Sequence, residues 1–348
     1  MTLVAHRDPT VLRDGLTRWF AARWDPVGAR IDALEHAAVG YSSETILVDV
    51  VWDGPDGRRC ESVVVRMAPA TVGTFADYDL TVQARAHELA ARAGVPVATP
   101  FVVETDPTWL GDPFAVMPRV EGHIAGESAA HDRWITSLEP ARQRRLHTNF
   151  VDALARIHDA DWSHGDADGL VPRRDVAAEL ERWARYLDWS SDGEPLPALV
   201  DALAWCRTHA PDDEGADARA ALLWGDVRLG NVVFGDDLSV RAVLDWDMTS
   251  IGRPEHDVAW LTTLESTMAE LTGRRVPGFL DRSGVIEHYE RVAGRTLHDL
   301  DWYEAFALVR STAIMVRIGL LRREAGDPSR SLVEENPILP LLLRRIHA

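Results

Sequence analysis

The sequence predicts an α+β fold, with an antiparallel sheet and a helix in the N-terminal part and mostly helices in the C-terminal part. Two apolar runs, residues 46–52 and 62–67, flank the turn-forming residues 53–57, a pattern typical of a β-hairpin. Apolar residues recur at helical spacing over 80–92 and through much of the chain beyond Gly122. With 348 residues and 46% hydrophobic content, the chain is long enough for two domains.

Charge and composition exclude several classes of protein. The formal charge of −18 opposes binding to nucleic acid, which requires a concentrated basic surface. Cys60 and Cys206 are the only cysteines and have no metal-ligand spacing, so we expect neither a disulfide scaffold nor a zinc site. No apolar stretch reaches the roughly 18 residues of a membrane span, and the N-terminus lacks the layout of a signal peptide. We therefore expect a cytoplasmic protein with no membrane partner.

The N-terminal elements can be predicted in order. Residues 10–24 carry apolar side chains at helical spacing, with Asp8 and Pro9 before them, as at the start of a helix. The small residues of 40–45 form a turn before the first strand of the hairpin. Residues 80–92 predict a second helix, and residues 110–122 predict a strand that ends in a glycine turn.

A stripe of apolar residues predicts the first long helix of the C-terminal part. Its members are Leu146, Phe150, Val151, Leu154 and Ile157. We expect His158, which follows the stripe, to lie at the edge of the core. From Ser283 the helical pattern continues to the end, and its aromatic residues are expected in the core.

Asp226, Asn231 and Asp245 are the most informative polar residues. Asn231 follows Asp226 by five positions on a tight loop, and Asp245 follows fourteen residues later, after another apolar run. Phosphoryl transfer from Mg-ATP needs such a set: Asp226 could accept a hydroxyl proton, while Asn231 and Asp245 supply oxygen ligands to magnesium. An ordinary turn between strands is the alternative, but it explains neither the spacing nor the second Asp.

The motifs at 224–231 and 244–248, Trp-Gly-Asp-Val-Arg-Leu-Gly-Asn and Leu-Asp-Trp-Asp-Met, resemble those of the aminoglycoside phosphotransferase and choline kinase group of small-molecule kinases. The resemblance covers most of the chain and extends to domains found with acyl-CoA dehydrogenases. It implies a bilobal protein-kinase-like fold, with a nucleotide-binding lobe over residues 1–120 and a catalytic and substrate-binding lobe over 121–348. It also implies ATP and Mg²⁺ as cofactors.

The family's usual His-Gly-Asp sequence occurs at 164–166. We reject it as the catalytic loop because position 171 is Val, where the motif requires Asn.

The resemblance implies nucleotide-binding roles in the N-terminal lobe. Three hydroxyl residues of the turn before the first strand would contact the phosphates: Ser42, Ser43 and Thr45. Arg66 stands where the family usually has Lys, and an Arg can still bind phosphate through two hydrogen bonds. The alternative is an Arg at a strand edge whose guanidinium extends into solvent. Met117 and Val120 would supply apolar walls to the adenine site near the hinge between lobes.

The resemblance also implies roles for three residues in or near the catalytic loop. Arg228 would stabilise charge on the transferring phosphoryl group, the alternative being an ion pair with a surface acid. Asp257 would satisfy backbone N–H groups near a helix start and brace the catalytic loop. Trp224 replaces the usual His, and its indole can fill the same space and donate one N–H.

We therefore predict an ATP- and Mg-dependent phosphotransferase that transfers the γ-phosphate to a hydroxyl of a small molecule. The acceptor would be an antibiotic, a hydroxyacyl thioester or another metabolite, and the protein a monomer or homodimer. The alternative is a nucleotide-binding regulator with little turnover, suggested by Arg66, Trp224 and Gln83, which stands where kinases commonly have a Glu. A protein kinase is disfavoured because no activation loop with an Ala-Pro-Glu segment follows Asp245.

Overall fold

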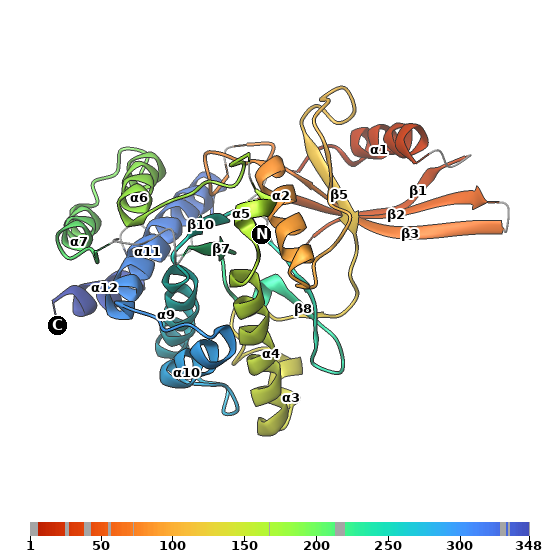
Figure 1. The fold of residues 1–348 in the computed structure, drawn as a ribbon. Coiled ribbons are helices and arrows are strands. Elements are labelled where there is room, and N and C mark those ends of the chain that lie inside the picture. The colour runs from red at the N-terminus through yellow and green to blue at the C-terminus, as the bar shows by residue number, and fades with distance from the viewer. Residues whose placement is uncertain are drawn as a thin grey trace. The chain divides into compact units, whose positions relative to one another are not determined.

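The computed structural model describes residues 6–24, 28–37, 43–54, 57–71, 73–166, 168–212, 220–327, 332 and 335–347. The chain divides into two compact units (Figure 1). The first unit contains Met1–Ala84 and Ala98–Val120, and the second contains Arg85–Val97 and Glu121–Ala348. Residues 85–97 thus group with the second unit, although the expected nucleotide-binding lobe includes them. The functional roles of the two units stay predictions.

An antiparallel sheet of five strands forms the first unit, in the order β1-β2-β3-β5-β4. Its strands are β1 (Arg30–His36), β2 (Glu44–Gly54), β3 (Gly57–Met67), β4 (Val102–Glu104) and β5 (Phe114–Pro118). The predicted hairpin is confirmed as β2 and β3. Both strands are longer than the apolar runs, because exposed pairs such as Asp53 with Arg58 continue the ladder to Gly54 and Gly57.

Helix α1 (Pro9–Arg23) confirms the predicted N-terminal helix and packs on this sheet. Asp8 caps it by accepting a hydrogen bond from the backbone N–H of Thr10 at 2.7 Å. Its apolar stripe shares one hydrophobic core with sheet residues such as Val48, Val50 and Phe114, and consists of Leu12, Leu16, Trp19 and Phe20. Burial of this stripe therefore fixes the helix on the sheet.

Helix α2 (Leu80–Arg92) has the predicted bounds. Its residues up to Ala84 group with the first unit, and those from Arg85 group with the second. In the second unit, Ala86, Leu89 and Ala90 join the hydrophobic core.

The second unit is mostly helical. Besides the end of α2, its described residues form the helices α3 (Arg133–Ser137), α4 (Pro140–His158), α5 (Trp162–Gly165), α6 (Val176–Ser190), α7 (Pro197–Thr208), α9 (Glu255–Thr272), α10 (Arg282–Ala293), α11 (Leu300–Glu324) and α12 (Leu339–Ile346). The predicted stripe from Leu146 to Ile157 lies on α4 and is buried. None of the described helices is both long and apolar enough to cross a lipid bilayer.

Two small antiparallel sheets position the loops of the second unit. Strands β6 (His123–Ile124), β8 (Val232–Phe234) and β9 (Val240–Val243) pair in the order β6-β8-β9, and β7 (Ala221–Leu223) pairs with β10 (Ser250–Gly252). The α+β prediction, with an antiparallel sheet first and helices later, is confirmed.

Candidate active site

The loop that carries Asp226 runs from β7 to the 3-10 turn η1 (Leu229–Asn231). Gly225, directly before Asp226, has a φ of 92°. A Cβ at this position would lie 2.4 Å from the carbonyl oxygen of Met248. Both the positive φ and the close backbone approach therefore require glycine at this turn.

Three donors hold the carboxylate of Asp226. Its Oδ2 accepts from Arg228 Nε at 2.9 Å and from Asn231 Nδ2 at 2.7 Å. Its Oδ1 accepts from the indole N–H of Trp260 at 3.1 Å. The side chain of Asp226 is nevertheless 20% exposed. The carboxylate is thus fixed in orientation and still reached by solvent, as a group that orients a substrate hydroxyl must be.

Asn231 is buried at the end of η1, and its amide orientation follows from its contacts. Its Nδ2 donates to the Oδ2 of Asp226 and, at 3.0 Å, to the backbone carbonyl of the same residue. Because the nitrogen serves as donor in both contacts, the amide oxygen is the atom that remains to bind a cation.

Backbone contacts join Asp245 to this pair. The N–H of Leu244 donates to the carbonyl of Asn231 at 2.8 Å. The indole N–H of Trp224 donates to the carbonyls of Leu244 and Asp245, at 2.8 and 3.0 Å. Asp245 itself has a φ of 59°, a left-handed conformation that costs a non-glycine residue roughly 1–2 kcal/mol and that is common at functional sites.

These contacts assign the role of Trp224. Trp224 is 1% exposed, so its side chain fills interior space beside the Asp226 loop. Its single N–H serves the turn that carries Asp245. The indole is thus buried and donates its one N–H, as expected, and its equivalence to the usual His stays a prediction.

Arg228 pairs with Asp226, its Nε lying 2.9 Å from the carboxylate. The Asp226 carboxylate raises the pKa of the Arg228 guanidinium, against the opposing effect of burial, and Asp245 adds to the increase. The guanidinium is therefore charged and near both carboxylates.

A buried network braces the loop from α9. Asp257 is fully buried and accepts from the backbone N–H groups of Trp224 at 2.7 Å and Gly225 at 3.0 Å. Asp257 thus braces the Asp226 loop, and the donors belong to this loop and not to the start of a helix. His158 Nε2 lies 3.1 Å from Asp257 Oδ2, and His158 Nδ1 lies 2.6 Å from the hydroxyl of Tyr289.

The tautomer of His158 follows from this network. A carboxylate oxygen only accepts hydrogen bonds, so the contact with Asp257 requires a proton on His158 Nε2. His158 Nδ1 is then free to accept from the hydroxyl of Tyr289. The expectation that His158 lies at the edge of the core is wrong, because the side chain is 2% exposed and lies inside this network.

Two residues near Asp226 were not identified from the sequence. Trp260, on α9, contacts Asp226 directly. Arg310, on α11, lies with its guanidinium carbon 4.5 Å from the centre of the Trp260 ring. Its Nη2 is also 3.5 Å from the carbonyl of Gly225. Burial lowers the pKa of Arg310 to about 10, with Glu179 opposing, so it remains charged at neutral pH.

In the first unit, Ser43, Thr45 and Arg66 lie together. Thr45 on β2 is the strand partner of Arg66 on β3. Arg66 Nη2 donates to Ser43 Oγ at 3.0 Å, and the two hydroxyl oxygens lie 3.4 Å apart. Arg66 does not snorkel from a strand edge, because it is 8% exposed and β3 is paired on both sides. Ser42 lies outside the described residues.

The two residues expected at adenine lie at the end of β5. Met117 is buried on this strand, opposite Val64 of β3. Val120 follows the strand and is partly exposed. Their contact with adenine stays a prediction.

The rejected His-Gly-Asp sequence forms a helical turn. Asp166 is buried, and its carboxylate accepts from the N–H groups of Leu170 and Val171, at 3.1 and 3.0 Å. It also pairs with Arg85 at 3.2 Å. Asp166 therefore has a structural role.

The fold and the loop around Asp226 define a kinase-like phosphotransferase. Residues 35–295 match the model of the phosphotransferase enzyme family, abbreviated APH, and the chain belongs to this family. A curated relative is the probable acyl-CoA dehydrogenase IBR3 of Arabidopsis thaliana, 28% identical over 271 residues, which are 69% of this chain and 32% of the relative. Acyl-CoA dehydrogenase family member 10 of Mus musculus is 27% identical over 71% of this chain and 23% of its own length. The chain thus spans about a quarter to a third of these relatives.

Solved structures support the same fold. A candidate aminoglycoside phosphotransferase from Ralstonia eutropha superposes with a TM-score of 0.70 at 21% identity, covering 96% of this chain and 98% of that one. A macrolide 2′-phosphotransferase of type I has a TM-score of 0.55 at 16% identity, covering 100% and 99% of the two chains. At these identities, the likeness establishes the fold alone.

Proposed function

We propose that this chain transfers the γ-phosphate of ATP, with Mg²⁺, to a hydroxyl of a small molecule. The proposal depends on one observation above all: Asp226 and Asn231 contact each other directly, and backbone bonds join Asp245 to them. Membership of the phosphotransferase enzyme family supports the type of reaction. The acceptor is the part that the family leaves open.

The residues of the second unit suit this chemistry. The carboxylate of Asp226 orients the acceptor hydroxyl and accepts its proton late in the reaction. Arg228 then stabilises charge that develops on the transferred phosphoryl group. The amide oxygen of Asn231 and the carboxylate of Asp245 are hard oxygen donors, which fit Mg²⁺. When bound, this ion neutralises the charge of the phosphates.

Residues of the first unit are proposed to bind the nucleotide. Arg66 presents a planar guanidinium that can bind phosphate oxygens in pairs. The hydroxyls of Ser43 and Thr45 lie beside it, and we keep Ser42 in this set from the sequence pattern. We assign Met117 and Val120 to the apolar surroundings of adenine. One structural neighbour, an aminoglycoside 2″-phosphotransferase, was solved with GDP and kanamycin, so ATP and GTP should be compared directly.

The function is tested by acceptor-stimulated release of ADP from purified protein. Two acceptor classes come first: hydroxylated antibiotics, because of the structural neighbours, and hydroxyacyl thioesters, because of the names of the curated relatives. We expect one class to increase ADP release, with a product heavier by one phosphoryl group in mass spectrometry. ATP binding without transfer to any acceptor would favour the regulator alternative.

The Asp245→Asn variant tests the magnesium ligands. Loss of the anionic ligand is expected to weaken ATP binding in the presence of Mg²⁺ about tenfold or more, and to leave Mg-free binding of ATP unchanged. Isothermal titration calorimetry with and without Mg²⁺ measures both. Asp236→Asn is the matched control, because the Asp236 side chain is 97% exposed. Equal losses with and without Mg²⁺ would contradict a role of Asp245 at the metal.

A further inference from the structure

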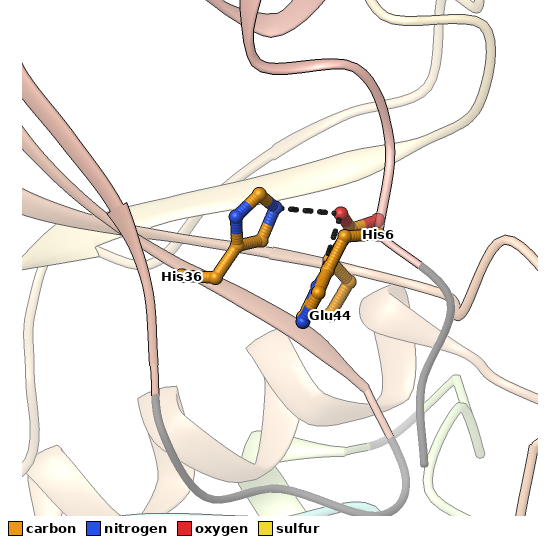
Figure 2. Close-up of side chains that lie close together, drawn as sticks. All are labelled: His6, His36 and Glu44. Atoms are coloured by element: carbon orange, nitrogen blue, oxygen red, sulfur yellow. Dashed lines mark hydrogen bonds and ion pairs between the residues drawn. The ribbon is translucent and has the colours of Figure 1, made fainter. Parts of the chain in front are cut away.

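We propose that His6, His36 and Glu44 of the first unit form a binding site for Zn²⁺ or a similar transition metal ion (Figure 2). His6 precedes α1, His36 ends β1 and Glu44 begins β2. Their potential ligand atoms all lie within 4.8 Å of one another. This inference does not depend on the proposed phosphotransfer.

The distances fit a tetrahedral site. Glu44 Oε1 is 3.0 Å from His36 Nε2 and 3.8 Å from His6 Nδ1. In a tetrahedral site with metal–ligand bonds of about 2.0–2.1 Å, neighbouring ligand atoms are about 3.3 Å apart. The two measured distances lie on either side of this value, so each imidazole nitrogen is near the separation from Glu44 that a shared metal ion requires. Figure 2 shows both histidines beside the Glu44 carboxylate.

The type of ligand selects the type of metal. Two imidazoles and one carboxylate form a common three-residue set for Zn²⁺, with water completing the coordination. Mg²⁺ prefers oxygen ligands throughout, so this site should differ from the one proposed at Asn231 and Asp245. We expected no zinc site because the two cysteines have no metal-ligand spacing. His6 and His36 are 30 positions apart in the sequence, so no local motif pointed to them.

Contacts around Glu44 hold its carboxylate in place. Glu44 is fully buried, and its Oε1 accepts from the backbone N–H of Arg7 at 2.8 Å. The Arg7 guanidinium pairs with Glu44 Oε2 and also contacts the carbonyl of Ala68 and the carboxylate of Asp112. Such partners orient a metal-binding carboxylate, and Asp112 offsets the positive charge of Arg7. A bound metal ion would link His6, which precedes α1, to Glu44 at the start of β2.

The test is Zn²⁺ binding by the full chain after treatment with a chelator. Competition with a chromogenic chelator should give one Zn²⁺ per chain with micromolar or tighter affinity. His6→Gln and His36→Gln should each weaken it by about 100-fold. His131→Gln, at an exposed histidine that contacts Ser128, should bind like the wild type. Circular dichroism verifies that each variant is folded.

Two further measurements make the result decisive. Co²⁺ bound to the wild type should produce the visible absorption of a low-symmetry nitrogen and oxygen site, and the double variant His6→Gln with His36→Gln should lack it. Millimolar Mg²⁺ should not displace Zn²⁺. If the double variant binds Zn²⁺ as tightly as the wild type, or if the wild type binds none, the histidines serve only as hydrogen-bond partners of Glu44 and the proposal is overturned.

Discussion

The Asp226→Asn variant is expected to lose about three orders of magnitude in turnover number, while it still binds ATP with Mg²⁺. An amide accepts no proton, and it offers one oxygen where three donors now converge on a carboxylate. Arg228 would also lose its ionic partner. The turnover number is measured by ADP release with the best acceptor from the screen, and ATP affinity is measured by calorimetry.

The exposed Asp236→Asn change serves as the control for this experiment as well, and it should leave both quantities unchanged. Turnover of Asp226→Asn close to that of the wild type would show that another group receives the hydroxyl proton. A variant that transfers no phosphate and binds no ATP would instead indicate a collapsed loop. In that case the Asp226→Glu variant, which keeps the negative charge, distinguishes collapse of the loop from loss of the group that accepts the proton.

Much of the site could be predicted because its key residues are close in sequence. The spacing from Asp226 to Asn231 is set by a single tight loop, and their contact at 2.7 Å follows from that loop. The strands on either side could be predicted from continuous apolar runs, whereas the roles of Asp257 and Trp224 followed from the family resemblance. Local patterns also placed the hairpin and the helices α1 and α2.

The remaining contacts depend on tertiary packing over long separations. Trp260 reaches Asp226 from a helix that begins 29 residues after it, and Arg310 reaches Gly225 from 85 residues away. The position of Arg310 within the apolar pattern of α11 could have indicated a special role for this side chain. The neighbouring residues in the sequence do not indicate that Gly225 and Trp260 are its partners. The grouping of His6, His36 and Glu44 has the same origin, because it depends on how the chain before α1 meets the sheet.

The Asp257→Asn variant is expected to give the largest loss of stability among single changes around the loop. Asp257 is fully buried, and its two oxygens accept from Trp224, Gly225 and His158. An amide leaves at least one buried backbone N–H facing another donor, and an unsatisfied buried group costs about 1–3 kcal/mol. With two groups affected, the free energy of unfolding should fall by about 3 kcal/mol, and the melting temperature by roughly 4 °C.

This loss of stability should extend to catalysis, because Asp257 holds the two residues directly before Asp226. We expect the turnover number of Asp257→Asn to fall more than its ATP affinity at a temperature where the protein remains folded, since a displacement of about 1 Å at the reacting group can cost about 100-fold. His158→Leu removes one donor to Asp257 and keeps both backbone contacts, so its effects on melting temperature and turnover should be smaller. A melting temperature of Asp257→Asn within about 1 °C of the wild type would show that the buried loop tolerates an amide, and that bracing by the carboxylate does not determine the position of Asp226.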